Sequence, residues 1–218
     1  MNICRFRQIS LAQQAPSPAM AAGNLPPAKY RRYMALQRNE DRLRMWEAHR
    51  LLIDTLDSQF TLNHALIQYV EQPGKKPYLP GQTGIRFNLA HSGTLAALAL
   101  SESETGIDIE EIVAHDHLSQ TARVFMSDTE WVTFNQLPEN ESLRFFYRIW
   151  TLKESLLKNM GTGILDNLRA YSFDLDGKSP LVRLNGKRLR GYHFFEIDIN
   201  PAYAASVCSC SPDPLVMM

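Results

Sequence analysis

The sequence predicts an α+β protein of two similar lobes, each a small, mainly antiparallel sheet packed with helices. Each half of the chain contains helical periodicity and about three strand-like runs, and 218 residues are enough for two such units. We place the boundary near residues 101–105, which gives an N-terminal lobe, 1–103, and a C-terminal lobe, 104–218. A functional site is expected between the lobes.

Composition narrows the class of protein. Hydrophobic residues make up 44% of the chain and charged residues 21%, which is typical of a soluble globular protein. Lys+Arg and Asp+Glu both number 23, so a generally basic nucleic-acid binder is not expected. The run "LAALAL" is too short to span a bilayer, the N-terminus has no signal core, and the three cysteines give no disulfide framework. We therefore expect a cytoplasmic protein without a membrane partner.

The first lobe is expected to contain one long helix followed by strands. Residues 39–60 place apolar side chains, among them Leu43 and Leu51, on one face at helical spacing. The Pro-rich segment 13–27 is interpreted as a loop that ends in a helix start. The strands expected in this lobe are "ALIQYV" (65–70), "IRFNLA" (85–90) and "TLAALAL" (94–100), with a Pro/Gly-rich loop at 71–84. A further strand, "GIDIE" (106–110), follows just beyond the lobe boundary.

The second lobe opens with helices and ends in strands. "SDTE" is a capping-box signature, in which Ser127 caps a helix and Glu130 returns the bond. Residues 141–161 form a long amphipathic helix with Gly161 as its stop. The strands expected after it are "AYSFDL" (170–175), "PLVRL" (180–184), "GYHFFEIDI" (191–199) and "AYAASVCSC" (202–210).

Two carboxylates interrupt the apolar run "TGIDIEEI". Side chains two apart on a strand point the same way, so Asp108 and Glu110 share a face opposite Ile107 and Ile109. Two like charges side by side are unfavourable unless a cation compensates them. For an isolated D-x-E motif, a solvated sheet edge is the simpler alternative.

The long helix adds a third carboxylate and a lysine. Trp150, Glu154 and Lys158 lie four residues apart and form one stripe. An exposed Glu–Lys pair worth about 0.3–0.5 kcal/mol is the alternative, but a large aromatic on the stripe argues against full exposure. If the stripe meets the strand, three oxygen ligands suit Mg²⁺ and the lysine suits a phosphate. This reasoning leaves a nuclease, a phosphohydrolase and a phosphotransferase open.

Four stretches together resemble a known family. "GIDIE" and "WTLKESLLKNMGTGI" are similar to the paired signature of the 4′-phosphopantetheinyl transferases, G-[IV]-D-x-E and W-x-x-K-E-[AS]-x-x-K. "FNLAHSG" (87–93) is similar to the family's F-N-x-S-H-S, and Lys76–Pro77 to its G-K-P loop. The match covers about residues 25–210, and the two-lobed length is that of the monomeric, Sfp-type branch. A monomer is therefore expected.

The resemblance implies a reaction and a set of residues. A serine of an apo acyl or peptidyl carrier protein would attack coenzyme A, take the 4′-phosphopantetheine arm and release 3′,5′-ADP. The implied catalytic residues are Glu154, Lys158 and Asp108, with Glu154 a candidate base and Lys158 neutralising the pyrophosphate. The implied ligands of Mg²⁺, or alternatively Mn²⁺, are Asp108, Glu110 and Glu154. The implied coenzyme A contacts are Arg44, Lys76, Pro77, His91 and Lys158.

The chain departs from the family's motifs at two positions. Ala90 stands where the family has the first serine of S-H-S, and Lys75 stands at the glycine of the G-K-P loop. Neither departure touches the implied metal ligands. Both bear on the affinity for coenzyme A.

The carrier protein is expected to dock on residues 111–126. Carriers are generally acidic around the modified serine, so apolar anchors and a cation should line this surface. The segment offers Leu118, Val124, Phe125 and Met126 as anchors and Arg123 as the cation, with the equal alternative that these residues only pack a helix. Two rival functions remain: a Mg²⁺-dependent phosphohydrolase acting on a pyrophosphate, and a carrier-binding homologue without catalysis. The sequence does not identify the carrier or its pathway.

Overall fold

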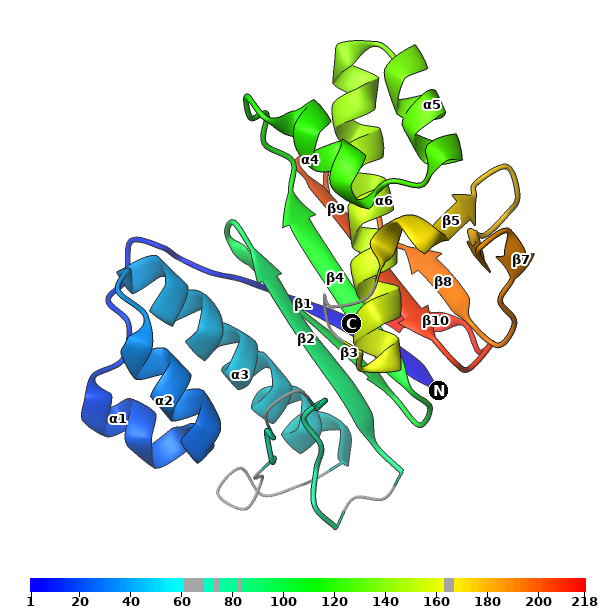
Figure 1. Ribbon diagram of the computed structural model, residues 1–218. Coiled ribbons are helices and arrows are strands. Elements are labelled where there is room, and N and C mark those ends of the chain that lie inside the picture. The colour runs from blue at the N-terminus through cyan, green and yellow to red at the C-terminus, as the bar shows by residue number, and fades with distance from the viewer. Residues whose placement is uncertain (61–68, 73–74, 82–83, 163–166) are drawn as a thin grey trace.

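The computed structural model describes residues 1–60, 69–72, 75–81, 84–162 and 167–218. It is a mixed α+β structure of several small sheets packed with helices, as the sequence predicts (Figure 1). The expected strand 65–70 lies largely outside the described residues, and only Val70 is seen in a β-bridge, to Tyr78. Within the described part of the chain, none of the helices combines the length and the apolar character needed to cross a membrane.

The first sheet contains four strands in the order β10-β1-β3-β2. Their bounds are Leu215–Met217, Asn2–Gln8, Leu95–Ser101 and Arg86–Ser92. β1 is antiparallel to β3 and parallel to β10, so the last strand of the chain joins the sheet that the first strand belongs to. The proposed lobe boundary at 103/104 stays a prediction.

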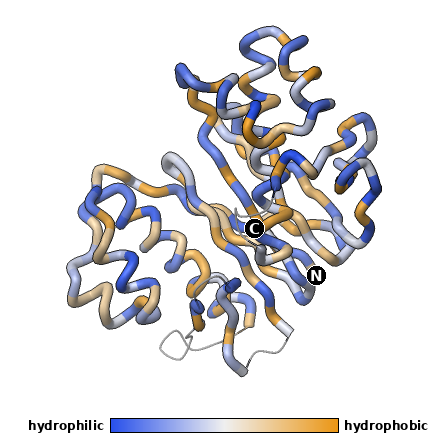
Figure 2. Tube along the Cα trace, viewed as in Figure 1, coloured by the Kyte–Doolittle hydropathy of each residue, from blue (hydrophilic) through white to orange (hydrophobic). Residues whose placement is uncertain are grey.

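Three helices accompany the first sheet. α3 (Asn39–Phe60) packs against β1, β2 and β3, and α1 (Pro18–Asn24) and α2 (Pro27–Ala35) follow each other beside it. The apolar face predicted for residues 39–60 is confirmed, since Leu43, Leu51 and Leu52 are buried in the core of this half. Figure 2 shows polar and apolar colours alternating along α3, as expected for a helix that covers one side of a sheet.

The second half is built around α6 (Glu139–Met160). β4 (Thr105–Glu111) pairs with β9 (Tyr203–Ser209), which pairs with β8 (His193–Glu196), all antiparallel. α6 packs on β4 and β9. The remaining elements are α4 (Leu118–Phe125), α5 (Asp128–Gln136), a 3₁₀ turn (Leu168–Ala170), β5 (Tyr171–Asp174), β6 (Leu181–Leu184) and β7 (Lys187–Arg188).

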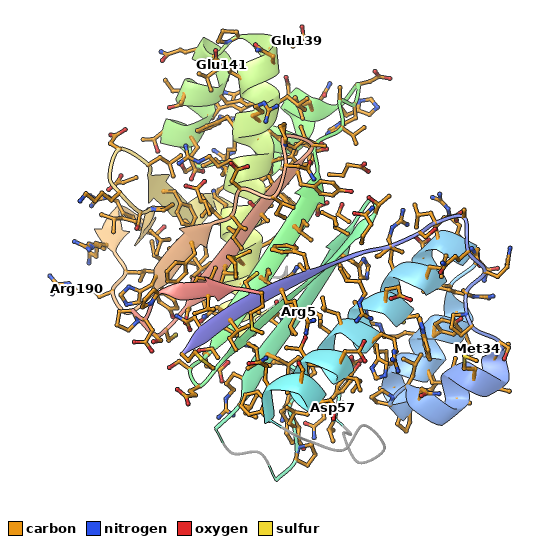
Figure 3. All side chains as sticks on the ribbon, turned by 180° about the vertical axis from the view of Figure 1, so that it is seen from behind. Arg5, Met34, Asp57, Glu139, Glu141 and Arg190 are labelled. Carbon is orange, nitrogen blue, oxygen red and sulfur yellow. The ribbon has the colours of Figure 1, made fainter. Side chains whose placement is uncertain are left out.

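Both predicted ends of the second-half helices are confirmed. Ser127 and Glu130 form the capping box at the start of α5, and Gly161 ends α6 in the left-handed conformation, with φ of 73°. α6 begins with Glu139 and Glu141, which suit the positive end of a helix dipole. Figure 3 shows both glutamates at the end of α6 beside α5, so the helix points its other end toward the sheets.

A buried ion pair holds α6 to α5. Lys153 Nζ lies 2.6 Å from Glu130 Oε2, and the lysine side chain is 0% exposed. Lys153 also donates to the carbonyls of Phe125 and Leu168, while Glu130 Oε1 accepts from the Phe173 amide. Every side-chain polar atom of the pair is therefore used, and the contacts join five segments of the second half.

We expect Lys153→Met to lower the free energy of unfolding by about 3–5 kcal/mol, because it leaves Glu130 buried without its cation. Urea denaturation measures the change. Lys178→Met removes an exposed lysine and should stay within about 0.5 kcal/mol of the wild type. The double variant Lys153→Met/Glu130→Gln should recover part of the loss. A Lys153→Met protein as stable as the Lys178→Met control would contradict the assignment.

Candidate functional site

β4 and α6 bring Asp108, Glu154 and Lys158 to one place, and Glu110 follows two residues later on β4. Asp108 is 4% exposed and its Oδ1 accepts a hydrogen bond from Lys158 Nζ at 2.6 Å. Glu154, one turn earlier on α6, is 6% exposed and faces the same region, where the negative charge of Asp108 acts on it. Glu110 is partly buried, and its Oε2 accepts from Ser92 Oγ at 2.8 Å.

A glycine allows this close approach. A Cβ on Gly106 would collide with the Ser155 carbonyl and the Asn159 amide of α6. The backbones of β4 and α6 are therefore in direct contact at this position. The contact places Asp108, two residues along the strand, against the second half of the helix.

The positive charge of the protein does not fully offset the burial of the three carboxylates. Burial raises the pKa of Asp108, Glu110 and Glu154, and the charge of Asp108 raises the pKa of the two glutamates further, while Lys158 opposes the shift. Asp108 Oδ2 and Glu154 Oε1 are buried without a hydrogen-bond partner among the described residues. Such oxygens are costly unless another group binds them.

The donor set fits a hard divalent cation. Carboxylate oxygens with neither Cys nor His are the ligands that Mg²⁺ prefers. As they stand, no three His, Cys, Asp or Glu of the described residues are close enough together to hold one ion. Lys158 occupies one oxygen of Asp108 instead. The two unpartnered oxygens are the atoms available to a cation.

A basic cavity lies on the first-half side of the site. Its volume is about 650 Å³, within the range of small-molecule sites. α2, α3, β2 and the segment around Pro77 surround it, and the charged or polar residues that line it include Lys29, Arg31, Lys75 and His91. Lys29 is 8% exposed, and burial lowers its pKa to about 8 although Glu71 opposes the shift.

Several positively charged side chains act on His91. Its ring keeps contact with solvent, yet desolvation, followed by the charges of Lys29, Lys158 and Arg44, lowers its pKa. Cations from α2, α3 and α6 therefore act on one ring on β2. This arrangement favours a ligand that carries several negative charges.

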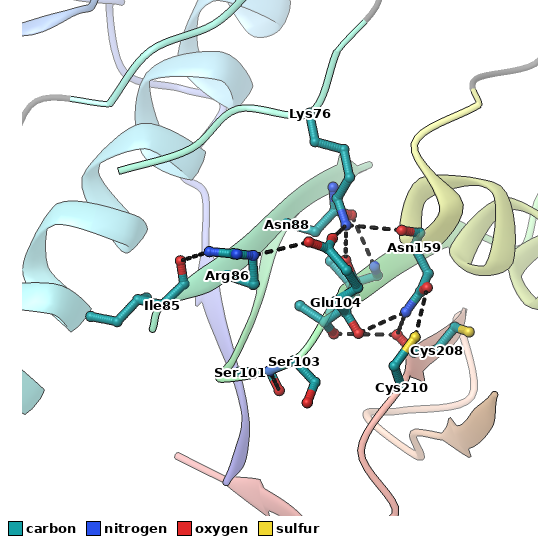
Figure 4. Close-up of polar contacts among 12 residues, drawn as sticks. Lys76, Ile85, Arg86, Asn88, Ser101, Ser103, Glu104, Asn159, Cys208 and Cys210 are labelled. Carbon is teal, nitrogen blue, oxygen red and sulfur yellow. Dashed lines mark hydrogen bonds and ion pairs between the residues drawn. The ribbon is translucent and has the colours of Figure 1, made fainter. Parts of the chain in front are cut away.

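Two of the predicted ligand residues have their charged groups engaged by the protein. Lys76 Nζ contacts Glu104 Oε2 at 2.5 Å and donates to the carbonyls of Thr105 and Asn159, while Arg86 shares Glu104 (Figure 4). This network ties the segment that carries Pro77 to the start of β4 and the end of α6. Pro77 lines the basic cavity, whereas Lys76 is not one of its lining residues.

Arg44 is also held by neighbouring groups. Its Nε donates to the Gly93 carbonyl at 2.8 Å, and its Nη1 lies 2.8 Å from Asp41. Gly93 follows Ser92 in the turn between β2 and β3, where its φ of 52° suits glycine. Arg44 therefore supports the turn that presents His91. Direct contact of Arg44 and Lys76 with coenzyme A stays a prediction.

The comparisons with known proteins agree with the motifs. Residues 104–208 match the family model described as the 4′-phosphopantetheinyl transferase superfamily. The 4′-phosphopantetheinyl transferase Sfp of Bacillus subtilis (strain 168) is 29% identical over 175 residues, which cover 77% of this chain and 76% of that protein. Over 77% of its length the chain is therefore similar to 4′-phosphopantetheinyl transferases.

Two further 4′-phosphopantetheinyl transferases are similar to the chain. The 4′-phosphopantetheinyl transferase psf-1 of Bacillus pumilus is 29% identical over 181 residues, covering 76% of each chain. The 4′-phosphopantetheinyl transferase AcpT of Escherichia coli O157:H7 is 39% identical over 106 residues, which cover 46% of this chain and 53% of that protein. The residues that match the superfamily model include β4 and α6, the two elements that carry the carboxylates.

The sequence predicts only part of this site. The basic residues between Lys29 and Arg50 suit a ligand with several phosphate charges, but their sequence does not indicate that Lys29 and Arg31 are among those that line the cavity. Ser92 contacts Glu110, and its position in "AHSG" gave no indication of that partner. Of the two departures from the family's motifs, Lys75 lines the cavity and Ala90 is buried at 6% exposure.

Proposed function

We propose that this protein transfers the 4′-phosphopantetheine arm of coenzyme A to a serine of an apo carrier protein and releases 3′,5′-ADP. The observation that carries the proposal is the pair of buried, unpartnered oxygens on Asp108 and Glu154 beside Lys158, at the edge of a basic cavity. The similarity to 4′-phosphopantetheinyl transferases supports this reaction class. Coenzyme A is the co-substrate.

The basic cavity is the proposed site for the nucleotide half of coenzyme A. Lys29 and Arg31 supply positive charge there, Pro77 supplies apolar surface, and His91 lies where the cations converge. We keep Arg44 and Lys76 as proposed ligand residues, with the alternative that they act by holding the β2–β3 turn and the Pro77 segment.

Asp108, Glu110 and Glu154 are the residues that would hold Mg²⁺, with Mn²⁺ as the alternative. The bound cation would supply charge neutralisation for the pyrophosphate. Glu154 accepts the proton of the carrier serine, whose oxygen then bonds to the phosphorus that bears the pantetheine arm. The bond from that phosphorus to the bridging oxygen breaks, and 3′,5′-ADP leaves with the electron pair. Lys158 turns from Asp108 toward the phosphate and balances its charge.

We propose that the carrier docks on residues 111–126, with a corrected set of anchors. Val124 is 75% exposed and can contact a partner, but Phe125 and Met126 are 1% and 0% exposed and pack in the core of the second half. Those two expected anchors are therefore wrong. Arg123 lies over the Trp131 ring and 3.5 Å from Asp128, and it stays the proposed cation of this surface.

The transfer is tested by intact-protein mass spectrometry. An apo carrier incubated with this protein, coenzyme A and Mg²⁺ should gain the mass of phosphopantetheine, and EDTA should abolish the gain. Both a fatty-acid-type and a peptidyl-type carrier are needed, because the site does not identify the partner. Coenzyme A hydrolysis without a mass gain would favour the phosphohydrolase. Carrier binding without transfer or hydrolysis would favour the non-catalytic homologue.

Three further expectations accompany the proposed function. We propose that the protein is a monomer, that it is cytoplasmic, and that it needs neither nucleic acid nor a membrane. They rest on composition and on the Sfp-type resemblance. Size-exclusion chromatography with light scattering tests the first, because a dimer would double the measured mass from 24.9 kDa.

A further inference from the structure

Ser92 joins two strands that belong to different sheets. It is the last residue of β2 in the first sheet, and β4 lies beside it as the edge of the second. The Ser92 hydroxyl donates to Glu110 Oε2 at 2.8 Å and accepts from the Glu111 amide at 3.1 Å. Both contacts are with β4.

Asn88, four residues before Ser92 on β2, makes a related contact with β4. Its Oδ1 accepts from the Ile107 amide at 2.9 Å. Asn88 and Ser92 are four residues apart on β2, as are Ile107 and Glu111 on β4, so both pairs lie on matching faces. Amides along a strand edge need acceptors when water is excluded, and these two side chains provide them.

The two side chains differ in one respect that matters for the site. Asn88 bonds to a backbone amide of β4, whereas Ser92 also binds a carboxylate. A hydroxyl has one hydrogen. Because Ser92 accepts from the Glu111 amide, its hydrogen is directed to Glu110. The carboxylate is thereby fixed from the first half of the chain.

Glu110 is held by fewer contacts than Asp108. It is less buried than Asp108, and among the described residues no lysine forms an ion pair with it, whereas Lys158 is bonded to Asp108. The Ser92 hydroxyl donates a hydrogen bond to the Glu110 carboxylate. The orientation of Glu110 therefore depends on Ser92.

We propose that Ser92 is a positioning residue that orients Glu110 for binding the divalent cation. The inference rests on the proposed function, since Glu110 is a proposed metal ligand. Ser92 itself contacts neither the cation nor the substrate. Residues that orient a metal ligand through a hydrogen bond typically change metal affinity by 10–100-fold when they are removed.

Titration of the full chain with Mn²⁺ alone, followed by electron paramagnetic resonance of the free ion, tests this role. Ser92→Ala should raise the Kd for Mn²⁺ by about tenfold or more. Ser92→Thr keeps the hydroxyl and should restore the Kd to within about threefold of the wild type. Asn88→Ala removes the companion contact and should lower thermal stability while leaving Mn²⁺ affinity nearly unchanged.

The outcomes separate this inference from the proposed function. An unchanged Kd in Ser92→Ala, or an equal rise in Asn88→Ala, would overturn the positioning role and leave Ser92 as a contact between strands only. Failure of Ser92→Thr to restore binding would also count against it. If the wild type binds no Mn²⁺, the metal part of the proposed function fails, and this inference fails with it.

Discussion

Glu154→Gln should reduce phosphopantetheinyl transfer by at least about 10²–10³-fold while the protein stays folded. The substitution keeps the shape of the side chain but removes the negative charge available to a cation and the basicity needed to accept the serine proton. The unfolding free energy should stay within about 1 kcal/mol of the wild type, because Glu154 Oε1 has no hydrogen-bond partner to lose among the described residues.

A matched control exists on the same helix. Glu141 lies in the first turn of α6 and is exposed, at the end far from the sheets (Figure 3). Glu141→Gln should leave the transfer rate within about twofold of the wild type. Mass spectrometry of the carrier measures the rates, and urea denaturation measures stability. Unchanged turnover in Glu154→Gln would remove the basis for the metal site and for the proposed base.

Gly106→Ala should destabilise the protein by about 3 kcal/mol or more. The added methyl group would overlap the Ser155 carbonyl and the Asn159 amide, which belong to the backbone of α6 and cannot rotate away. Relief requires β4 and α6 to separate. Separation would also move Glu154 and Lys158 away from Asp108, so the folded fraction should have a lower kcat.

Gly23→Ala is the control for the change of residue type. Gly23 lies in α1, and nothing comes within 4 Å of the position where its Cβ would be. Alanine favours a helix over glycine, so this variant should gain up to about 1 kcal/mol. Thermal and urea denaturation of both variants give the comparison. A Gly106→Ala protein within 1 kcal/mol of the wild type would show that the two backbones do not touch as described.

Local periodicity accounts for the parts of the fold that the sequence predicts. α3, α6 and β4 were each expected within a few residues of their observed bounds, because their apolar spacing repeats within one element. The capping box and Gly161 were identified for the same reason, since their signals lie within four residues of the helix ends they define.

The missed elements depend on distant partners or on ambiguous residues. β1 mixes Arg5 and Arg7 with apolar side chains, and its partners lie at residues 95–101 and 215–217. α1 was missed because the prolines of segment 13–27 indicate a loop as readily as a helix start, and Pro18 is in fact at the first turn. No local signal separates these alternatives.

In the candidate site, too, features within one element could be predicted from the sequence, but contacts between distant elements could not. The shared face of Asp108 and Glu110 follows from strand geometry alone, and their meeting with α6 is visible in the structure as the Lys158–Asp108 pair. The burial of Lys153 could not be predicted, because a lysine among charged neighbours on a helix is usually exposed and its partner Glu130 lies in another helix. The engagement of Lys76 by Glu104 and Asn159 likewise requires knowledge of how distant segments meet.

The position of β10 in the first sheet has a consequence for the order of events during synthesis. β1 is synthesised before both of its partners: β3, its antiparallel neighbour, follows some ninety residues later and β10 some two hundred residues later. Pairings between residues so far apart in sequence close slowly. Until residues 215–217 are available, one edge of β1 lacks its partner strand and can pair with other chains. We expect the nascent first half to depend on the rest of the chain for protection from aggregation.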